Sequence, residues 1–161
     1  MSLAAPGRVP KVSVVLAVYN GERHLQESLR SVLAQTFTDF ELIVVDDGST
    51  DRTMEILAAV ERADPRVAVV RHGNRGLTAS LIRGVSLAQG TYLARQDADD
   101  ISKPQRFERQ VAYLDGHPSV AALGTLADVI DRSGDAVGAL TATSGARAVR
   151  RGLITSSSSP V

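Results

Sequence analysis

Two short segments that are apolar at almost every position constrain the fold of this chain more than any other feature. They are Lys11–Val18 (KVSVVLAV) and Phe40–Val45 (FELIVV), both of strand length, the first rich in β-branched residues. A strand with apolar side chains on both faces has to be covered on both faces, which is typical of a parallel sheet between layers of helices. The two segments therefore predict central strands of an α/β protein.

Amphipathic segments alternate with these strands and with further strands along the chain. In chain order, the other expected elements are a helix at Arg23–Gln35, a helix capped by Thr50 or Asp51, a strand at Val67–Arg71, a helix that buries Leu77, Leu81, Val85 and Ala88, a strand at Tyr92–Gln96, and a helix at Pro104–Asp115. This alternation predicts a three-layer α/β/α sandwich with a mainly parallel sheet.

The pattern changes after His117-Pro118, where Val120–Leu123, Ala127–Ile130 and Ala136-Val137 are predicted to form strands. We expect one domain at residues 11–140, preceded by a disordered lead-in at 1–10. Residues 141–161 are expected to be a flexible tail.

Composition excludes several classes of function. The chain has no cysteine, so neither a disulfide framework nor a thiolate metal site can form. Its 18 basic and 18 acidic residues give no net field for nucleic acid, and we expect no nucleic-acid partner. No apolar run approaches the roughly 18 residues of a transmembrane segment. We expect a cytoplasmic protein, with peripheral attachment at the inner membrane face left open.

Polar residues gather in three loops, each of which follows a predicted strand. The loops are Tyr19–Glu22, Asp46–Asp51 and Asp97–Asp100. Because the carboxyl ends of parallel strands lie on one edge of a sheet, we expect the loops to converge. Three carboxylates within four residues repel one another, and a divalent cation or basic partners would relieve this repulsion. A solvated acidic turn that caps the next helix is the alternative.

Two long motifs carry a resemblance to a known family. The segments VSVVLAVYNGERHLQESLRSVLAQTFTDFELIVVDDGSTDRT and GNRGLTASLIRGVSLAQGTYLARQDADD resemble family 2 glycosyltransferases, inverting enzymes with the GT-A fold. The resemblance covers about Lys11–Gly124, and it implies that residues 141–161 are the remnant of a truncated acceptor-binding half. It implies transfer of a sugar from a nucleotide-diphosphate donor, expected to be a UDP-sugar, to a saccharide or lipid-linked acceptor. It also implies a divalent cation, Mn²⁺ or Mg²⁺, at the DXD motif within ARQDADDISKPQRF.

The resemblance also implies roles for individual residues. Asp99 is expected to ligate the cation directly, and Asp97 belongs to the metal set as well. Asp97 and Asp100 would act through water, through sugar hydroxyls or on the acceptor side. Asp47 would accept the uracil N3–H, and Arg75 or Arg71 would pair with the pyrophosphate. The expected nucleotide- and donor-binding residues are Ala17, Tyr19, Asn20, Glu22, Asp46, Asp47, Arg75, Asp97 and Ala98.

Two departures from the family pattern leave alternatives open. Ile82 stands where the family commonly has Asn, and none of Asp128, Asp131 and Asp135 matches the family's general-base motif, so the catalytic base is unknown. A non-catalytic or truncated nucleotide-sugar-binding domain is therefore the second hypothesis. A flavodoxin-like signalling domain that binds Mg²⁺ is the third. The three histidines, His24, His72 and His117, have no metal-ligand spacing and are interpreted as helix-surface or loop residues.

Overall fold

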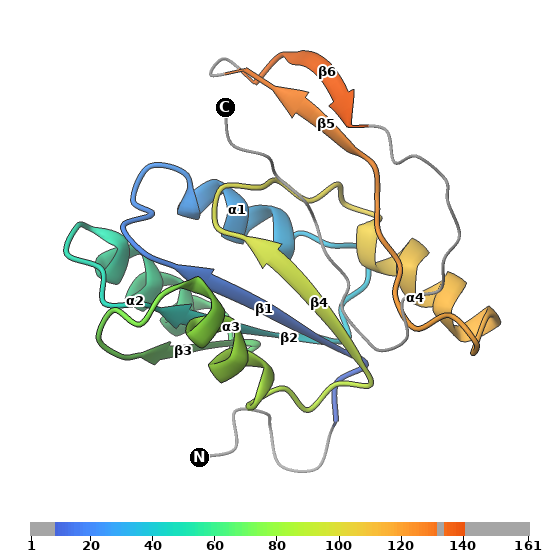
Figure 1. Ribbon diagram of the computed structural model, residues 1–161, viewed down its shortest axis with the longest axis horizontal. Coiled ribbons are helices and arrows are strands. Elements are labelled where there is room, and N and C mark those ends of the chain that lie inside the picture. The colour runs from blue at the N-terminus through green and yellow to red at the C-terminus, as the bar shows by residue number, and fades with distance from the viewer. Residues whose placement is uncertain (1–8, 132–133, 141–161) are drawn as a thin grey trace.

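The computed structural model describes residues 9–131 and 134–140 (Figure 1). The elements are β1 (Val12–Val18), α1 (Leu25–Leu33), β2 (Phe40–Asp46), α2 (Thr53–Ala63), β3 (Val67–Arg71), α3 (Leu77–Val85), β4 (Tyr92–Asp97), α4 (Arg106–Gly116), β5 (Ala127–Ile130) and β6 (Ala136–Leu140). The predicted lead-in at 1–10 and tail at 141–161 lie outside the described residues, apart from Val9 and a buried Pro10. No helix in the described ranges is long and apolar enough to cross a membrane.

Four strands form one parallel sheet in the order β3-β2-β1-β4. Every residue of β1 and of β2 is buried. Both strands lie inside the sheet and between helices, which is why both of their faces are apolar. The predicted parallel sheet with helices on both faces is confirmed.

Helices α1, α2 and α4 cover one face of this sheet, and α3 covers the other (Figure 1). The even-numbered side chains of β1 pack in one core with Leu29 of α1, Leu57 of α2 and Phe107 of α4. On the opposite face, a Cβ atom at Gly84 of α3 would lie only 2.4 Å from Val15 Cγ1. Helix α3 therefore approaches the sheet so closely that its backbone touches β1.

This close approach explains why the prediction for the buried face of α3 was wrong. Leu77 and Val85, which were expected to face the core, are 54% and 41% exposed. The buried residues of the helix are Ser80 and Gly84. Small side chains let two elements approach each other, and the spacing of large apolar residues does not reveal such a face.

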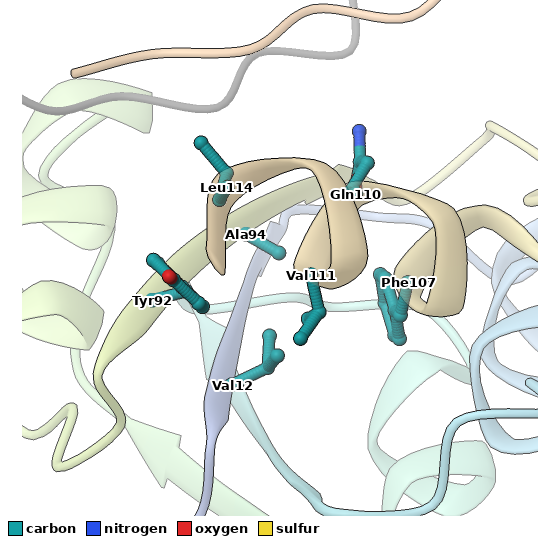
Figure 2. Close-up of a pocket in the computed structure, with 7 residues that line it drawn as sticks. All are labelled: Val12, Tyr92, Ala94, Phe107, Gln110, Val111 and Leu114. Carbon is teal, nitrogen blue, oxygen red and sulfur yellow. The ribbon is translucent and has the colours of Figure 1, made fainter. Parts of the chain in front are cut away.

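Helix α4 is tightly packed against the edge of the sheet. A void of about 10 Å³ lies beneath it. Its lining residues, drawn in Figure 2, are Val12, Tyr92, Ala94, Phe107, Gln110, Val111 and Leu114. A void of this size is no larger than about one water-sized probe, so it cannot hold a ligand. Helix α4 therefore supports the sheet, and this face offers no binding cavity there.

The strand predicted at Val120–Leu123 is not formed, whereas β5 and β6 confirm the strands predicted at Ala127–Ile130 and Ala136-Val137. These two strands pair antiparallel in a separate two-stranded sheet. Within the described part of the chain, no strand pairs with residues 120–123. Two alanines and Gly124 also give this segment little preference for a strand, so its few apolar residues were misleading.

Candidate functional site

The ends of three neighbouring strands bring the polar loops together, as predicted. In the register of the sheet, Val18 of β1 is paired with Asp46 of β2, and Ala17 is paired with Asp97 of β4. Acidic strand ends therefore flank the end of β1 on both sides. Ala17 itself is buried between its neighbours.

Asn20 fastens the loop after β1 to the loop after β2. Its N–H donates to Ser49 Oγ at 2.9 Å, and its Oδ1 accepts the Thr50 N–H at 2.8 Å. The φ angle of Asn20 is 51°, in the left-handed region that asparagine adopts more readily than most residues. Tyr19 precedes this junction, and its side chain is half exposed. Asn20 thus fixes the position from which the Tyr19 ring projects.

Glu22 joins the first loop to the start of α2. Its N–H donates to Asp51 Oδ2, and its Oε2 accepts the Arg52 N–H, both at 3.1 Å. Asp51 Oδ1 accepts the Thr53 N–H at 3.0 Å, as its predicted capping role requires. These carboxylates satisfy N–H groups at the positive end of the helix dipole. In this structure the carboxylate of Glu22, predicted at the nucleotide rim, is engaged with α2.

The adjacent carboxylates Asp46 and Asp47 are both buried, and they have different partners. Asp46 Oδ1 accepts the Ser49 N–H at 3.1 Å, which closes a tight turn. Asp47 Oδ1 accepts the Arg75 N–H at 2.8 Å, and its Oδ2 accepts the Gly76 N–H at 2.9 Å. Asp47 therefore holds the loop after β3 against the end of β2. Arg75 reaches this carboxylate through its backbone, and both Arg75 and Arg71 are exposed.

The surroundings of Asp47 keep it ionised. Burial raises its pKa, but hydrogen bonds from the Arg75 N–H, the Ser80 hydroxyl and the Gly76 N–H outweigh burial. The nearby His72 acts in the same direction, and the resulting pKa lies below its ordinary value. The site therefore contains a buried anion at the junction of β2 with the loop after β3.

Gly48 makes this junction sterically feasible. Its φ angle is 79°, and a Cβ atom added there would lie 2.8 Å from the backbone nitrogen of Asn74. Any larger residue would force the loop after β3 away from Asp47.

His72 belongs to this site, although the sequence placed it only in a loop. Its Nδ1 lies 2.7 Å from the Gly73 carbonyl oxygen and 3.3 Å from Asp47 Oδ1. Its Nε2 lies 3.3 Å from Ser80 Oγ on α3, and the side chain is only 14% exposed. One signal could have identified it, because His72 directly follows β3 and so lies on the same sheet edge as the three polar loops.

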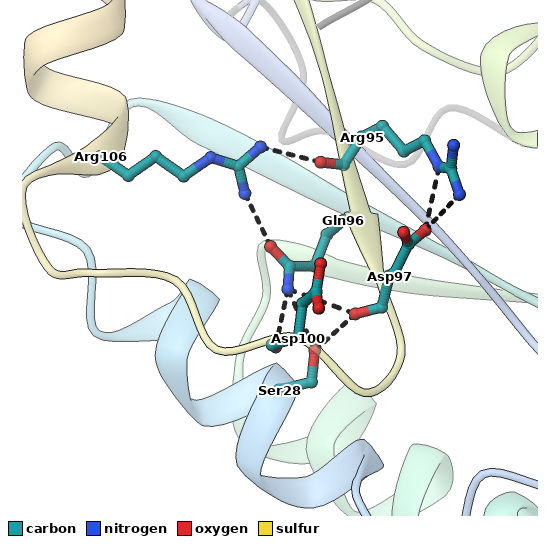
Figure 3. Close-up of polar contacts among 6 residues, drawn as sticks. All are labelled: Ser28, Arg95, Gln96, Asp97, Asp100 and Arg106. Atoms are coloured by element: carbon teal, nitrogen blue, oxygen red, sulfur yellow. Dashed lines mark hydrogen bonds and ion pairs between the residues drawn. The ribbon is translucent and has the colours of Figure 1, made fainter. Parts of the chain in front are cut away.

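Residues Asp97–Asp100 form a tight turn after β4 (Figure 3). The Asp100 N–H donates to the Asp97 carbonyl at 3.3 Å. Ser28 Oγ of α1 donates to the same carbonyl at 3.0 Å, while Gln96 Nε2 donates to the carbonyls of Asp97 and Asp100 at 3.2 and 2.8 Å. The backbone of the turn is therefore anchored on its helix-facing side.

The acidic side chains of this turn differ in their surroundings. Asp97 Oδ1 accepts hydrogen bonds from Arg95 Nε at 2.9 Å and forms an ion pair with its Nη2 at 2.6 Å. Asp99 lies at the tip of the turn with Ala98, and Asp99 is exposed. The structure shows no hydrogen bond or ion pair between the Asp99 side chain and another residue of the described part. The tip of the turn thus presents one carboxylate to solvent.

Arg106 is a second residue that the sequence analysis missed. It is 9% exposed, and its guanidinium points toward the Gln96 side chain and the Arg95 carbonyl (Figure 3). Its Nη1 donates to Gln96 Oε1 at 2.7 Å and to Ser102 Oγ at 2.9 Å, and its Nη2 donates to the Arg95 carbonyl at 2.8 Å. These contacts fix the Gln96 amide in the orientation that binds the turn.

The acidic turn compensates part of the cost of burying the Arg106 charge. Burial lowers the pKa of Arg106, and the negative charges of Asp100 and Asp97 oppose this lowering. A buried charge needs such compensation. The sequence signal for this network is Gln96, a polar residue at a fully buried strand position that requires polar partners.

The acidic turn does not form a closed metal cage. Within the described ranges, no three Asp, Glu or His side chains converge into a group that could hold a metal ion. Mg²⁺ in phosphate-binding sites is commonly held by about one or two carboxylates, with substrate phosphates and water completing its shell. The turn offers the carboxylate oxygens that such a site needs, and Asp99 is the most accessible of them.

Known proteins share this sequence pattern. The sequence model described as Glycosyl transferase family 2 matches residues 13–153, which include all the strand-end loops. The chain is 44% identical to EpsE of Bacillus subtilis over 127 residues, which cover 78% of this chain and 46% of EpsE. It is 34% identical over 130 residues to a chondroitin synthase of Escherichia coli, covering 81% of this chain and 19% of the synthase.

Solved structures share the fold. The crystal structure of Staphylococcus aureus TarS 1–349 in complex with UDP matches with a TM-score of 0.69 and 30% identity, over 76% of this chain and 37% of TarS 1–349. The parallel sheet and its helices therefore have the GT-A fold. The chain spans less than half the length of each of these relatives. With most of its length matched by the family model, the chain belongs to glycosyl transferase family 2.

Proposed function

We propose that this chain is the donor-binding part of an inverting glycosyltransferase that uses a UDP-sugar. The convergence of the buried anion Asp47 and the acidic turn Asp97–Asp100 on the end of β1 carries the proposal. Ligands of open α/β sheets bind beyond the carboxyl ends of the strands. TarS, matched over 76% of this chain, has been solved with UDP and also with UDP-GlcNAc, which supports a uridine nucleotide.

Asp47 is the residue proposed to recognise the base. Its two oxygens accept two backbone N–H groups and the Ser80 hydroxyl, and a carboxylate has about four acceptor positions in all, so one remains for a further donor. Uracil offers its N3–H as that donor, whereas cytosine has no hydrogen at N3. Tyr19, 51% exposed beside the neighbouring strand end, would stack on the base.

A divalent cation fits the acidic turn by the chemistry of its donors. The turn contributes only carboxylate and carbonyl oxygens, which Mg²⁺ and Mn²⁺ prefer. Asp99 would hold the ion directly, because it is exposed and the structure shows no partner for it among the described residues. A bound ion would neutralise charge on the departing nucleoside diphosphate.

Transfer of the sugar is proposed for the whole protein, because this chain matches less than half the length of its relatives. The proposed acceptor is a saccharide or a lipid-linked saccharide. Inverting transfer needs a general base beside the acceptor hydroxyl, which contributes roughly 10²–10⁴ in rate. None of the described carboxylates is assigned to that role.

Thermal unfolding with nucleotides tests the proposal. UDP with Mn²⁺ should stabilise the chain by about 2.7 kcal/mol at a concentration of about 100 times Kd. For a chain of this length, that stabilisation corresponds to a rise in Tm of about 5–10 °C. CDP should give a much smaller rise, and a preference for GDP over UDP would exclude the assignment to uracil.

Substitution at the turn tests the cation. In Asp99→Asn, the additional stabilisation by UDP with Mn²⁺ over UDP with EDTA should disappear, while the Tm without ligand stays unchanged because the residue is exposed. Glu27→Gln removes an exposed carboxylate from α1 and should behave as the wild type. Equal stabilisation by UDP in EDTA and in Mn²⁺, for the wild type, would refute the metal dependence.

A further inference from the structure

Arg95 and Asp97 form an ion pair inside the proposed donor site. They are two residues apart on β4, so their side chains leave the same face of the strand. Arg95 directs both Nε (2.9 Å) and Nη2 (2.6 Å) at one oxygen, Asp97 Oδ1. The side chains are only 26% and 15% exposed, so water screens the pair less than it would at the surface.

The backbone of the turn keeps the two partners together. Ser28 and Gln96 both donate to the carbonyl of Asp97 from the opposite side (Figure 3). Arg95 is fixed as well, because its own carbonyl accepts a hydrogen bond from Arg106. The backbone of neither residue can therefore shift without disturbing this network.

Asp99 has a different environment, although it is only two residues further along. It is exposed at the tip of the turn, and the structure shows no partner for it among the described residues. A cation that approaches the turn meets an isolated negative charge at Asp99. At Asp97 it meets a carboxylate that is already neutralised by a guanidinium, and it is repelled by that guanidinium.

We propose that Arg95 withholds Asp97 from the divalent cation, which leaves Asp99 as the direct carboxylate ligand within Asp97-Ala98-Asp99. This inference rests on the proposed function, which places the cation at this turn. Arg95 is thus a positioning residue that sets the affinity for the cation. A single carboxylate binds Mn²⁺ weakly, and a diphosphate adds further oxygen ligands when it binds.

Binding of Mn²⁺ alone, followed by the electron paramagnetic resonance signal of the free ion, tests the inference without relying on catalysis. Arg95→Met should bind Mn²⁺ more tightly than the wild type, by about tenfold or more, since the substitution removes a repelling charge and gives the ion access to Asp97. In an Asp97→Asn background the same substitution removes only the repelling charge. In that background the gain in affinity for Mn²⁺ should therefore be about five to ten times smaller than the gain from Arg95→Met in the wild type.

The double variant Arg95→Met/Asp97→Asn gives a second, charge-neutral test. It removes an ion pair of zero net charge, so its affinity for Mn²⁺ should stay within about threefold of the wild type, a difference well under 1 kcal/mol. Arg83→Met removes an exposed arginine from α3 and serves as the control for loss of a distant positive charge. Arg95→Gln is made in parallel, and near-ultraviolet circular dichroism checks that each variant is folded.

Two results would overturn the inference. One is an equal gain in affinity for Mn²⁺ from Arg95→Met (or Arg95→Gln) in the wild type and in the Asp97→Asn background. The other is a loss of about tenfold or more in the affinity of the double variant for Mn²⁺, which is expected if Asp97 is a direct ligand. Failure of the proposed function has a different signature, because Asp99→Asn would then leave the affinity of the wild type for Mn²⁺ unchanged.

Discussion

Replacing Asp47 by asparagine perturbs the junction on which the proposed base site depends. Asparagine has nearly the same shape, but one of the two acceptor oxygens becomes an NH₂ group. That group would face the N–H of Arg75 or of Gly76, both of which donate to Asp47 at under 3 Å. One hydrogen bond is lost, two donors confront each other, and the negative charge that strengthens both bonds disappears.

The magnitude follows from these contacts. A hydrogen bond to a charged group contributes roughly 1.5–3 kcal/mol, and a buried donor left unpaired costs about 1–3 kcal/mol. The two effects overlap, because the loop after β3 can shift to relieve part of the conflict. We expect Asp47→Asn to lower the free energy of unfolding by about 2–3 kcal/mol, or the Tm by about 4–12 °C for a chain of this length.

The effect should depend on pH with a defined sign. The pKa of Asp47 is lowered from its ordinary value of 3.8, so the folded state binds this proton less readily than the unfolded state. The stability that Asp47 contributes is therefore complete above about pH 5 and is lost as the pH falls through the lowered pKa of the folded state. The difference between wild type and Asp47→Asn should be largest near neutral pH and should shrink below pH 3.8.

Urea unfolding of both proteins across this pH range measures the effect. Asp46→Asn is the matched control, because Asp46 accepts the Ser49 N–H through Oδ1, and asparagine retains that oxygen. That control should cost less than about 1 kcal/mol. A loss below about 0.5 kcal/mol for Asp47→Asn at neutral pH, or an equal loss at every pH, would refute the reasoning.

Two further predictions concern the support of the site. Gly84→Ala should destabilise the chain by about 1–3 kcal/mol despite the better helix propensity of alanine, since its Cβ would lie 2.4 Å from Val15 Cγ1. Gly124→Ala, which has open space around its Cβ position, is the control in thermal unfolding. A Gly84→Ala variant that is more stable than the wild type would contradict this packing. Arg106→Met should lower the free energy of unfolding in urea by about 2–3 kcal/mol, because it leaves Gln96 Oε1 without its guanidinium donor. Arg106→Lys should recover part of this loss. A Met variant as stable as the wild type would show that the buried charge is dispensable.

Elements whose sequence pattern follows directly from burial were predictable. The strands at Lys11–Val18 and Phe40–Val45 are apolar on both faces because helices cover both faces, and the structure places both inside the sheet. The buried face of α3 was not predictable in the same way. Its contact surface consists of Ser80 and Gly84, and neither residue contributes to an apolar stripe.

The same division applies to the site. Asp46 and Asp97 could be placed because they end strands that pair with β1, and the register of a parallel sheet brings strand ends together. The contacts of His72 with Ser80 and of Arg106 with Gln96 could not be placed, because these partners lie 8 and 10 residues away on other elements.

The missed residues also change what the acidic motif means physically. From the residue types alone, Asp97-Ala98-Asp99 contains two carboxylates that repel each other. In the structure, Arg95 neutralises the first carboxylate, and Gln96 and Arg106 hold the backbone that carries both. The repulsion that suggested a cation is therefore relieved in part by the chain itself. Under the proposed function, the exposed charge of Asp99 is the one left for a cation in this motif, so the strength of cation binding should depend on the basic residues around the motif as much as on its carboxylates.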